Sequence, residues 1–183
     1  MKKTYLFSSL IFLFFIGCGP SETPKIEFTF TMNEITNTVP SYQMAIWMET
    51  PDGNYVETFF VCDYLSYGGY NIEGICPVWV KKAHWEKTPE EVVDAVTQAT
   101  PDIGGVQLVF NAPVKKFPAG TYKYFIEIHN AENYNEIYSG TLAVKKDGST
   151  SVSEAAVTYN PKKYPEGSGL LSNVKAKYFI GKE

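Results

Sequence analysis

The chain has 183 residues, of which 44% are hydrophobic, and a formal net charge of −4. This length suits one domain with a sizeable core. The acidic charge argues against nucleic acid as a partner, and no basic cluster offsets it, because the densest groups of lysines are isolated pairs such as Lys81 and Lys82. Neither Cys-x-x-Cys nor Cys-x-x-Cys-His occurs, so thioredoxin-like chemistry and covalent haem have no support.

The N-terminus has the order of a secretory signal. Lys2 and Lys3 precede an apolar run at 5–16 that is too short to span a bilayer, which predicts a signal peptide over 1–17. Gly17-Cys18 resembles the lipobox of bacterial lipoproteins, whose cysteine is acylated. The resemblance implies a Cys18 lipid anchor on the extracytosolic side of the bacterial cell envelope; the alternative is a plain signal peptide with an incidental cysteine.

The exported part is expected to comprise a tether at 18–25, rich in small and polar residues, and a single domain at 26–183. Loss of the two N-terminal lysines lowers its formal charge from −4 to −6. Alternating apolar and polar residues separated by turns predict an all-β fold, an immunoglobulin-like antiparallel β-sandwich. The expected strands are 25–32, 42–50, 55–62, 106–111, 121–129, 137–144, 151–159 and 174–180.

Two cysteines remain in the exported domain, Cys62 and Cys76. In an oxidising compartment they could form a disulfide. A metal site that combined them with His84 and His129 is a weaker alternative, because the two histidines have no ligand spacing. Tyrosines at 64–70 could stack on a ligand, although capping one end of the sandwich is the simpler interpretation.

One short inserted helix is expected. Thr88-Pro89-Glu90-Glu91 has the pattern of a capping box with proline at the first helical position. Val92, Val93, Val96 and Ala99 form its apolar stripe. Pro101 ends the helix and disfavours helical backbone at Thr100, so the Thr100 hydroxyl should be presented in a loop.

The last part of this helix, Asp94 to Thr100, reads Asp-x-x-Thr-x-Ala-Thr. This pattern resembles the motif at which FMN transferases attach flavin to exported proteins. The resemblance implies that Thr100 carries FMN through a phosphoester, while Asp94, Thr97 and Ala99 serve recognition by the transferase. The alternative is an ordinary amphipathic helix in which these residues have no special role.

The wider sequence resembles a bacterial family of exported proteins called domain of unknown function 2271. The matching features span roughly 42–145 and include the hairpin at 45–58, Trp85 and the turn at 118–122. The resemblance implies a small partner of FMN transferases and membrane redox proteins. We therefore expect a lipid-anchored electron carrier with covalent FMN, rather than an enzyme with its own substrate. A non-enzymatic lipid-anchored module that binds a protein or glycan is the alternative.

Overall fold

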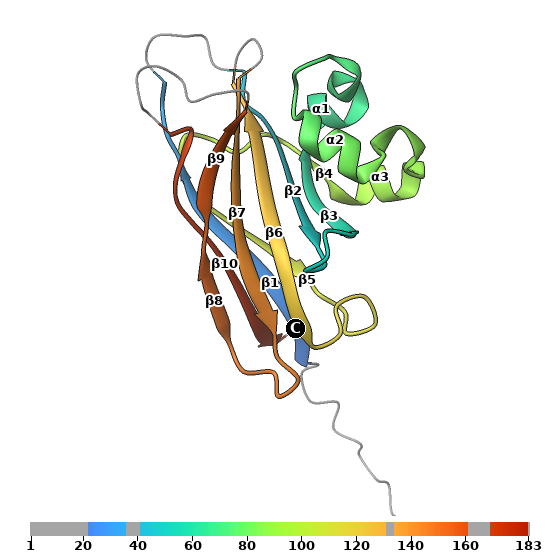
Figure 1. Ribbon diagram of the computed structural model, residues 1–183, viewed down its shortest axis with the longest axis vertical. Coiled ribbons are helices and arrows are strands. Elements are labelled where there is room, and N and C mark those ends of the chain that lie inside the picture. The colour runs from blue at the N-terminus through green and yellow to red at the C-terminus, as the bar shows by residue number, and fades with distance from the viewer. Residues whose placement is uncertain (1–21, 36–40, 131–133, 161–168, 183) are drawn as a thin grey trace, which may run out of the picture.

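The computed structural model describes residues 22–35, 41–130, 134–160 and 169–182, and these form two packed β-sheets with three short helices on one side (Figure 1). The predicted all-β sandwich is confirmed. The expected Cys18 anchor lies outside the described residues.

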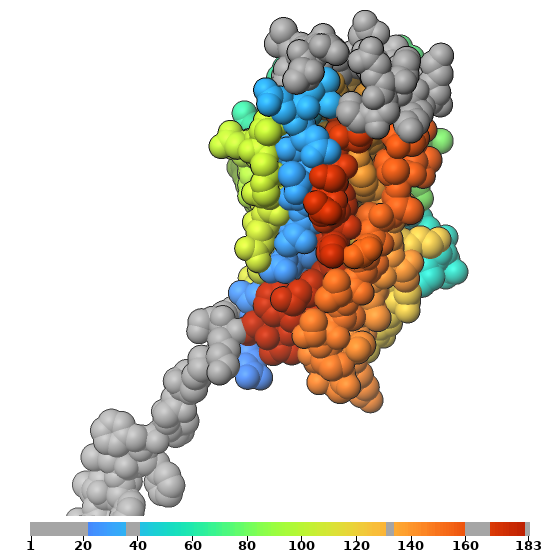
Figure 2. Space-filling view, turned by 90° about the vertical axis from the view of Figure 1, so that its left-hand side faces the viewer, coloured from blue at the N-terminus to red at the C-terminus, as the bar shows by residue number. Residues whose placement is uncertain are grey.

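The first sheet has four antiparallel strands in the order β5-β1-β10-β8. Figure 2 views this sheet from outside. Its central strand begins at Glu22, so the expected tether is wrong for residues 22–25. Pro24 has no N–H to donate, but its carbonyl accepts a hydrogen bond from the Ala112 N–H at 2.8 Å. The strand therefore tolerates a proline at this position. The strands are β5 (Gly104–Asn111), β1 (Glu22–Met32), β10 (Leu171–Lys182) and β8 (Ser151–Glu154).

The second sheet has six strands in the order β4-β3-β2-β6-β7-β9. All its neighbours are antiparallel except β3 and β4, which run parallel. The strands are β4 (Thr97–Gln98), β3 (Tyr55–Cys62), β2 (Gln43–Glu49), β6 (Gly120–His129), β7 (Asn135–Val144) and β9 (Ala156–Asn160).

The single strand predicted at 151–159 is wrong, because it is two strands in different sheets. β8 pairs with β10, whereas β9 pairs with β7. The chain changes sheets at Ala155, whose N–H donates to the carbonyl of Val174 at 3.0 Å. Alternation continues through such a corner, so periodicity alone does not reveal the change of sheet.

Aromatic rings fill the space between the sheets. Phe28 of β1 lies 5.6 Å from Phe59 and 6.0 Å from Tyr124 between ring centroids, which joins the first sheet to β3 and β6. All three residues are buried. Pairs at these distances and tilts stabilise a core beyond the area they bury.

Residues 63–96, called here the helical segment, lie against the outer side of β2 and β3 (Figure 1). The segment contains three α-helices where one was predicted, so the prediction of a single inserted helix is wrong in number. Its elements are α1 (Asp63–Tyr67), α2 (Pro77–Ala83) and α3 (Glu90–Val96), with 3₁₀ helices η1 (Gly69–Asn71) and η2 (Trp85–Lys87).

The helical segment is held by buried indoles and one buried carboxylate. Trp79 lies 4.8 Å from Trp85 between ring centroids, and its Nε1 donates to Thr58 Oγ1 at 2.9 Å. The carboxylate of Glu127 accepts the N–H groups of Val78 at 3.2 Å and Trp79 at 2.6 Å. Burial raises the pKa of Glu127 to about 7 even though these two hydrogen bonds oppose the shift.

Candidate functional site

The start of α3 differs from the sequence prediction. Pro89 is the N-cap and the structure has no side-chain cap there, so the capping box predicted at Thr88 is wrong. Thr88 instead follows η2, and its N–H donates to the carbonyl of Trp85 at 3.0 Å. Helical backbone begins only after Pro89, so Thr88 is one residue too early to cap the helix.

The end of α3 also comes earlier than expected. The helix ends at Val96, and Thr97 and Gln98 then pair in parallel with Val61 and Cys62 of β3. Only Asp94 of the motif residues is therefore helical. Thr97 and Thr100 lie on non-helical chain, as the prediction required for Thr100.

The structure brings two of the recognition residues against α1. Tyr67 Oη donates to Asp94 Oδ1 at 2.7 Å. Thr97 Oγ1 donates to the carbonyl of Val93 at 2.7 Å, so its lone pairs remain to accept from Ser66 Oγ, also at 2.7 Å. Both contacts join parts of the chain about 30 residues apart, and they fix the motif on a folded surface. Ala99 is exposed.

Thr100 is exposed, but its hydroxyl is turned toward the protein. Its Oγ1 lies 3.5 Å from the carbonyl oxygen of Tyr42, which is a long hydrogen bond. The hydroxyl also bonds the Cys62 thiol, although burial dominates and raises the pKa of that thiol to about 11. Both partners are weak, so rotation about χ1 can turn the hydroxyl to solvent at small cost.

Cys62 and Cys76 are free, buried thiols in the structure, which contradicts the expected disulfide. The two side chains have separate partners. Cys76 Sγ donates to the carbonyl of Gln43 at 3.4 Å, while Cys62 bonds Thr100 and the backbone of Met44. Each thiol therefore packs against β2 instead of bonding the other.

The aromatic residues near the motif divide into buried and exposed ones. Trp85 is buried, and its Nε1 donates to the carbonyl of Ser66 at 3.0 Å. Trp85 therefore holds α1 in place from the interior of the protein. Tyr67 is 60% exposed and Tyr64 is 54% exposed on α1. Among the aromatic residues of α1 and η2, the two tyrosines can therefore contact a ligand at this surface.

Sequence reasoning identified Asp94, Thr97 and Thr100, but not the residues that contact them. Ser66 and Tyr42 carry no local signal, and Tyr67 was notable only as part of a tyrosine cluster.

Among the described residues, no group of three or more His, Cys, Asp and Glu side chains could hold a metal ion. No helix within the same residues is long and apolar enough to cross a membrane.

Comparison with known proteins extends this description. A family model described as "Predicted periplasmic protein (DUF2271)" matches residues 24–160, which include α1, α3 and Thr100. No curated protein and no solved structure matches the chain. The match covers the six-stranded sheet and the whole helical segment, but β10 of the four-stranded sheet lies beyond it.

Proposed function

The chain belongs to the DUF2271 family of predicted periplasmic proteins, and from that premise we propose that it carries FMN covalently on Thr100 and transfers electrons in the cell envelope. A lipid on Cys18 is part of the proposal. The FMN transferase that loads the flavin and a membrane redox protein are its partners.

The exposure of Thr100 beyond the end of α3 is the observation that carries the proposal. A modifying enzyme needs a hydroxyl that it can approach and backbone that is not locked in a helix. Thr100 meets both conditions because non-helical chain precedes it and Pro101 follows it. Asp94 and Thr97 are meanwhile held in place by Tyr67 and Ser66.

The position of α3 imposes little electrostatic penalty on a phosphoester at Thr100. A phosphate at the negative end of a helix dipole is disfavoured, but this effect fades within the last turn. α3 ends at Val96, four residues before Thr100, so little of the penalty remains.

Lysine side chains of α2 do not contribute to binding this phosphate. Lys82 contacts Glu49 and Gly53 beside the β2–β3 turn, at the opposite end of β3 from Cys62 and Thr100. Seven residue steps along β3 separate the two ends, which is about 23 Å.

FMN supplies one- and two-electron redox chemistry when it is bound. The chain's own contribution is to hold and shield the group. α1 begins next to Cys62 and extends about 8 Å to Tyr67. This distance is short enough for a flavin tethered at Thr100 to reach the Tyr67 ring. The exposed ring of Tyr67 is kept in position by its bond to Asp94.

The test is to co-express the protein with an FMN transferase and to measure intact mass and in-gel flavin fluorescence after denaturation. We expect flavin on the wild-type protein and none on Thr100→Ala. Thr88→Ala is the matched control and should remain fully modified, since Thr88 lies outside the motif, its side chain does not cap α3, and the variant keeps the backbone N–H that bonds Trp85.

Two results would reject the proposal. One is no flavin on the wild-type protein under conditions that modify a known substrate. The other is flavin that persists in Thr100→Ala. The first result would favour the alternative, a lipid-anchored sandwich module that binds a protein or glycan partner, and the second would mean that another residue carries the flavin.

A further inference from the structure

A groove of about 790 Å³ lies between the β2–β3 turn and α2. A volume of this size is typical of small-molecule sites. One wall is the turn with Gly53, Asn54 and Tyr55. The other wall is formed by Pro77, Val78, Lys81, Lys82, Ala83 and His84.

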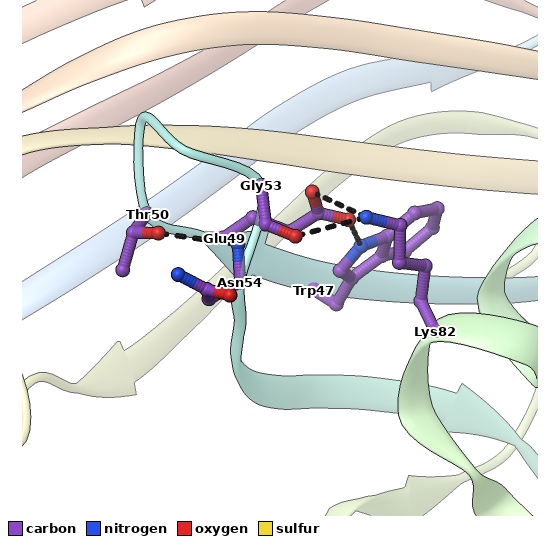
Figure 3. A network of polar contacts seen from close by, with 6 residues as sticks. All are labelled: Trp47, Glu49, Thr50, Gly53, Asn54 and Lys82. Carbon is purple, nitrogen blue, oxygen red and sulfur yellow. Dashed lines mark hydrogen bonds and ion pairs between the residues drawn. The ribbon is translucent and has the colours of Figure 1, made fainter.

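The two walls are tied together by polar contacts (Figure 3). Lys82 reaches from α2 to the turn, where its Nζ lies 3.1 Å from Glu49 Oε2 and donates to the Gly53 carbonyl at 2.9 Å. Trp47 Nε1 donates to the other carboxylate oxygen of Glu49 at 2.9 Å. The Thr50 N–H donates to the Asn54 carbonyl at 2.8 Å, and the Asn54 N–H donates to Thr50 Oγ1 at 3.2 Å, which closes the turn. The groove is therefore preformed.

One side of the groove is a fixed aromatic surface. Tyr55 is 38% exposed, and its hydroxyl donates to Thr58 Oγ1 at 2.8 Å. The same Oγ1 accepts the indole N–H of buried Trp79. This pair of bonds holds the ring in place, so a planar apolar group can stack on it at little cost in side-chain entropy.

The charge in the groove is positive. Glu49 behind the groove is buried and already paired with Lys82, and among the described residues no carboxylate lines the groove. Lys81 and His84 are exposed, and within the described residues neither side chain has a hydrogen bond or an ion pair. On a protein of net charge −4, an unpaired ammonium group beside an imidazole selects an anion.

His84 occupies its position despite an unfavourable backbone. It follows the last residue of α2 with φ 49° and ψ 47°, in the left-handed region where glycine or asparagine is usual. Glycine would satisfy the helix end with less strain. Histidine adopts this conformation more readily than most residues, and here it places the imidazole at the edge of the groove.

We propose that this groove binds a small organic anion with a planar apolar body. The oxyanion, a phosphate or carboxylate, accepts hydrogen bonds from Lys81 Nζ and the His84 ring, while the apolar body stacks on Tyr55. The site lies at the other end of β3 from Thr100, and the proposal does not depend on flavin attachment.

The test is amide NMR of the purified full-length protein, titrated in separate experiments with naphthyl phosphate and naphthoate. We expect saturable shifts centred on Asn54, Tyr55, Lys81 and His84 with at least one of the two anions. Comparison of their affinities distinguishes phosphate from carboxylate. Neutral naphthalenemethanol and inorganic phosphate, each lacking one half of the ligand, should bind more weakly.

Variants locate the site. Lys81→Gln and His84→Gly should each raise the Kd by about tenfold, since each removes a charge-assisted hydrogen bond. His84→Gly relaxes the backbone, so its loss of binding cannot be attributed to unfolding. Lys145→Gln, the same charge change at a distant exposed lysine, should leave the Kd unchanged.

Three outcomes would overturn the proposal. The first is the absence of saturable shifts with both aryl anions, and the second is equal affinity for the neutral alcohol. The third is an unchanged Kd in both Lys81→Gln and His84→Gly.

Discussion

The two sheets have outer faces of opposite character. On the four-stranded sheet, the outer face carries exposed Val109 and Val152. On the six-stranded sheet, the helical segment covers Trp47, Glu49 and Glu127, and all three are buried. Both faces are built from strands, so the difference comes from residues 63–96. These residues turn one face into a second core, and the candidate flavin site and the groove both lie at its margins.

The largest expected effect comes from removing an indole beneath the helical segment. Trp79→Ala should lower the free energy of unfolding by about 3–5 kcal/mol, because it leaves a cavity and removes the donor to Thr58. Val152→Ala on the uncovered face should change it by no more than about 0.5 kcal/mol, since Val152 is 62% exposed. Urea denaturation monitored by circular dichroism measures both. Equal effects would mean that the helical segment contributes no core.

The next effect is a pH dependence caused by Glu127. Its folded-state pKa of about 7 is raised above the ordinary value of 4.5, so the folded protein binds this proton more tightly than the unfolded chain does. The stability contributed by protonation is complete below the unfolded pKa and is lost as pH rises through about 7. The loss is on the order of 3 kcal/mol.

Glu127→Gln tests this assignment, because a glutamine cannot lose the proton. Denaturation curves at several values between pH 4 and pH 8 should show a steeper decline in stability for the wild type than for the variant. Identical pH profiles would show that another group is responsible for the decline.

The smallest expected difference is between two ion pairs, one on each outer face, in their contribution to the free energy of unfolding. Lys82 and Lys177 have equal side-chain exposure of 39%, and their partners are Glu49 under the helical segment and Glu27 on the uncovered face. Lys82→Met should cost about 2 kcal/mol, because it leaves the buried Glu49 with only the Trp47 donor.

Lys177→Met should cost no more than about 0.5 kcal/mol, since Glu27 keeps a hydrogen bond from Gln107. Urea midpoints of the two methionine variants, measured at low and high salt, make the comparison. A larger loss of unfolding free energy for Lys177→Met than for Lys82→Met would mean that the ion pair on the uncovered face contributes more to stability.

The strands were the most predictable part of the fold. Tyr55–Cys62 was predicted with its observed bounds, because the proline and glycine of the preceding turn mark its start. β1, β5, β6, β7 and β10 extend beyond their predicted bounds by a few residues, since neighbouring backbone supplies hydrogen bonds that side-chain alternation does not indicate, whereas β2 is one residue shorter at each end. The change of sheet at Ala155 also has no local signal, because it depends on which strand's backbone pairs with β8 and which with β9.

The helices α1 and α2 could not be predicted from periodicity. Five and seven residues are too few to establish a helical repeat, and such short helices depend on tertiary contacts. α2 receives these contacts from Glu127, nearly 50 residues away in sequence. In the candidate site, the motif was visible as a local pattern, whereas Ser66 and Tyr42 meet it only through the fold.

The early start of β1 determines how far the motif would lie from the bilayer. Four residue steps separate Cys18 from Glu22, a reach of at most about 14 Å. β1 then runs about 33 Å to Met32, and beyond it Asn33 accepts a hydrogen bond from Tyr42, whose own carbonyl lies beside Thr100. With the proposed lipid on Cys18, an upright domain holds Thr100 at its membrane-distal end. A membrane redox partner would then reach the flavin through a domain that projects into the periplasm.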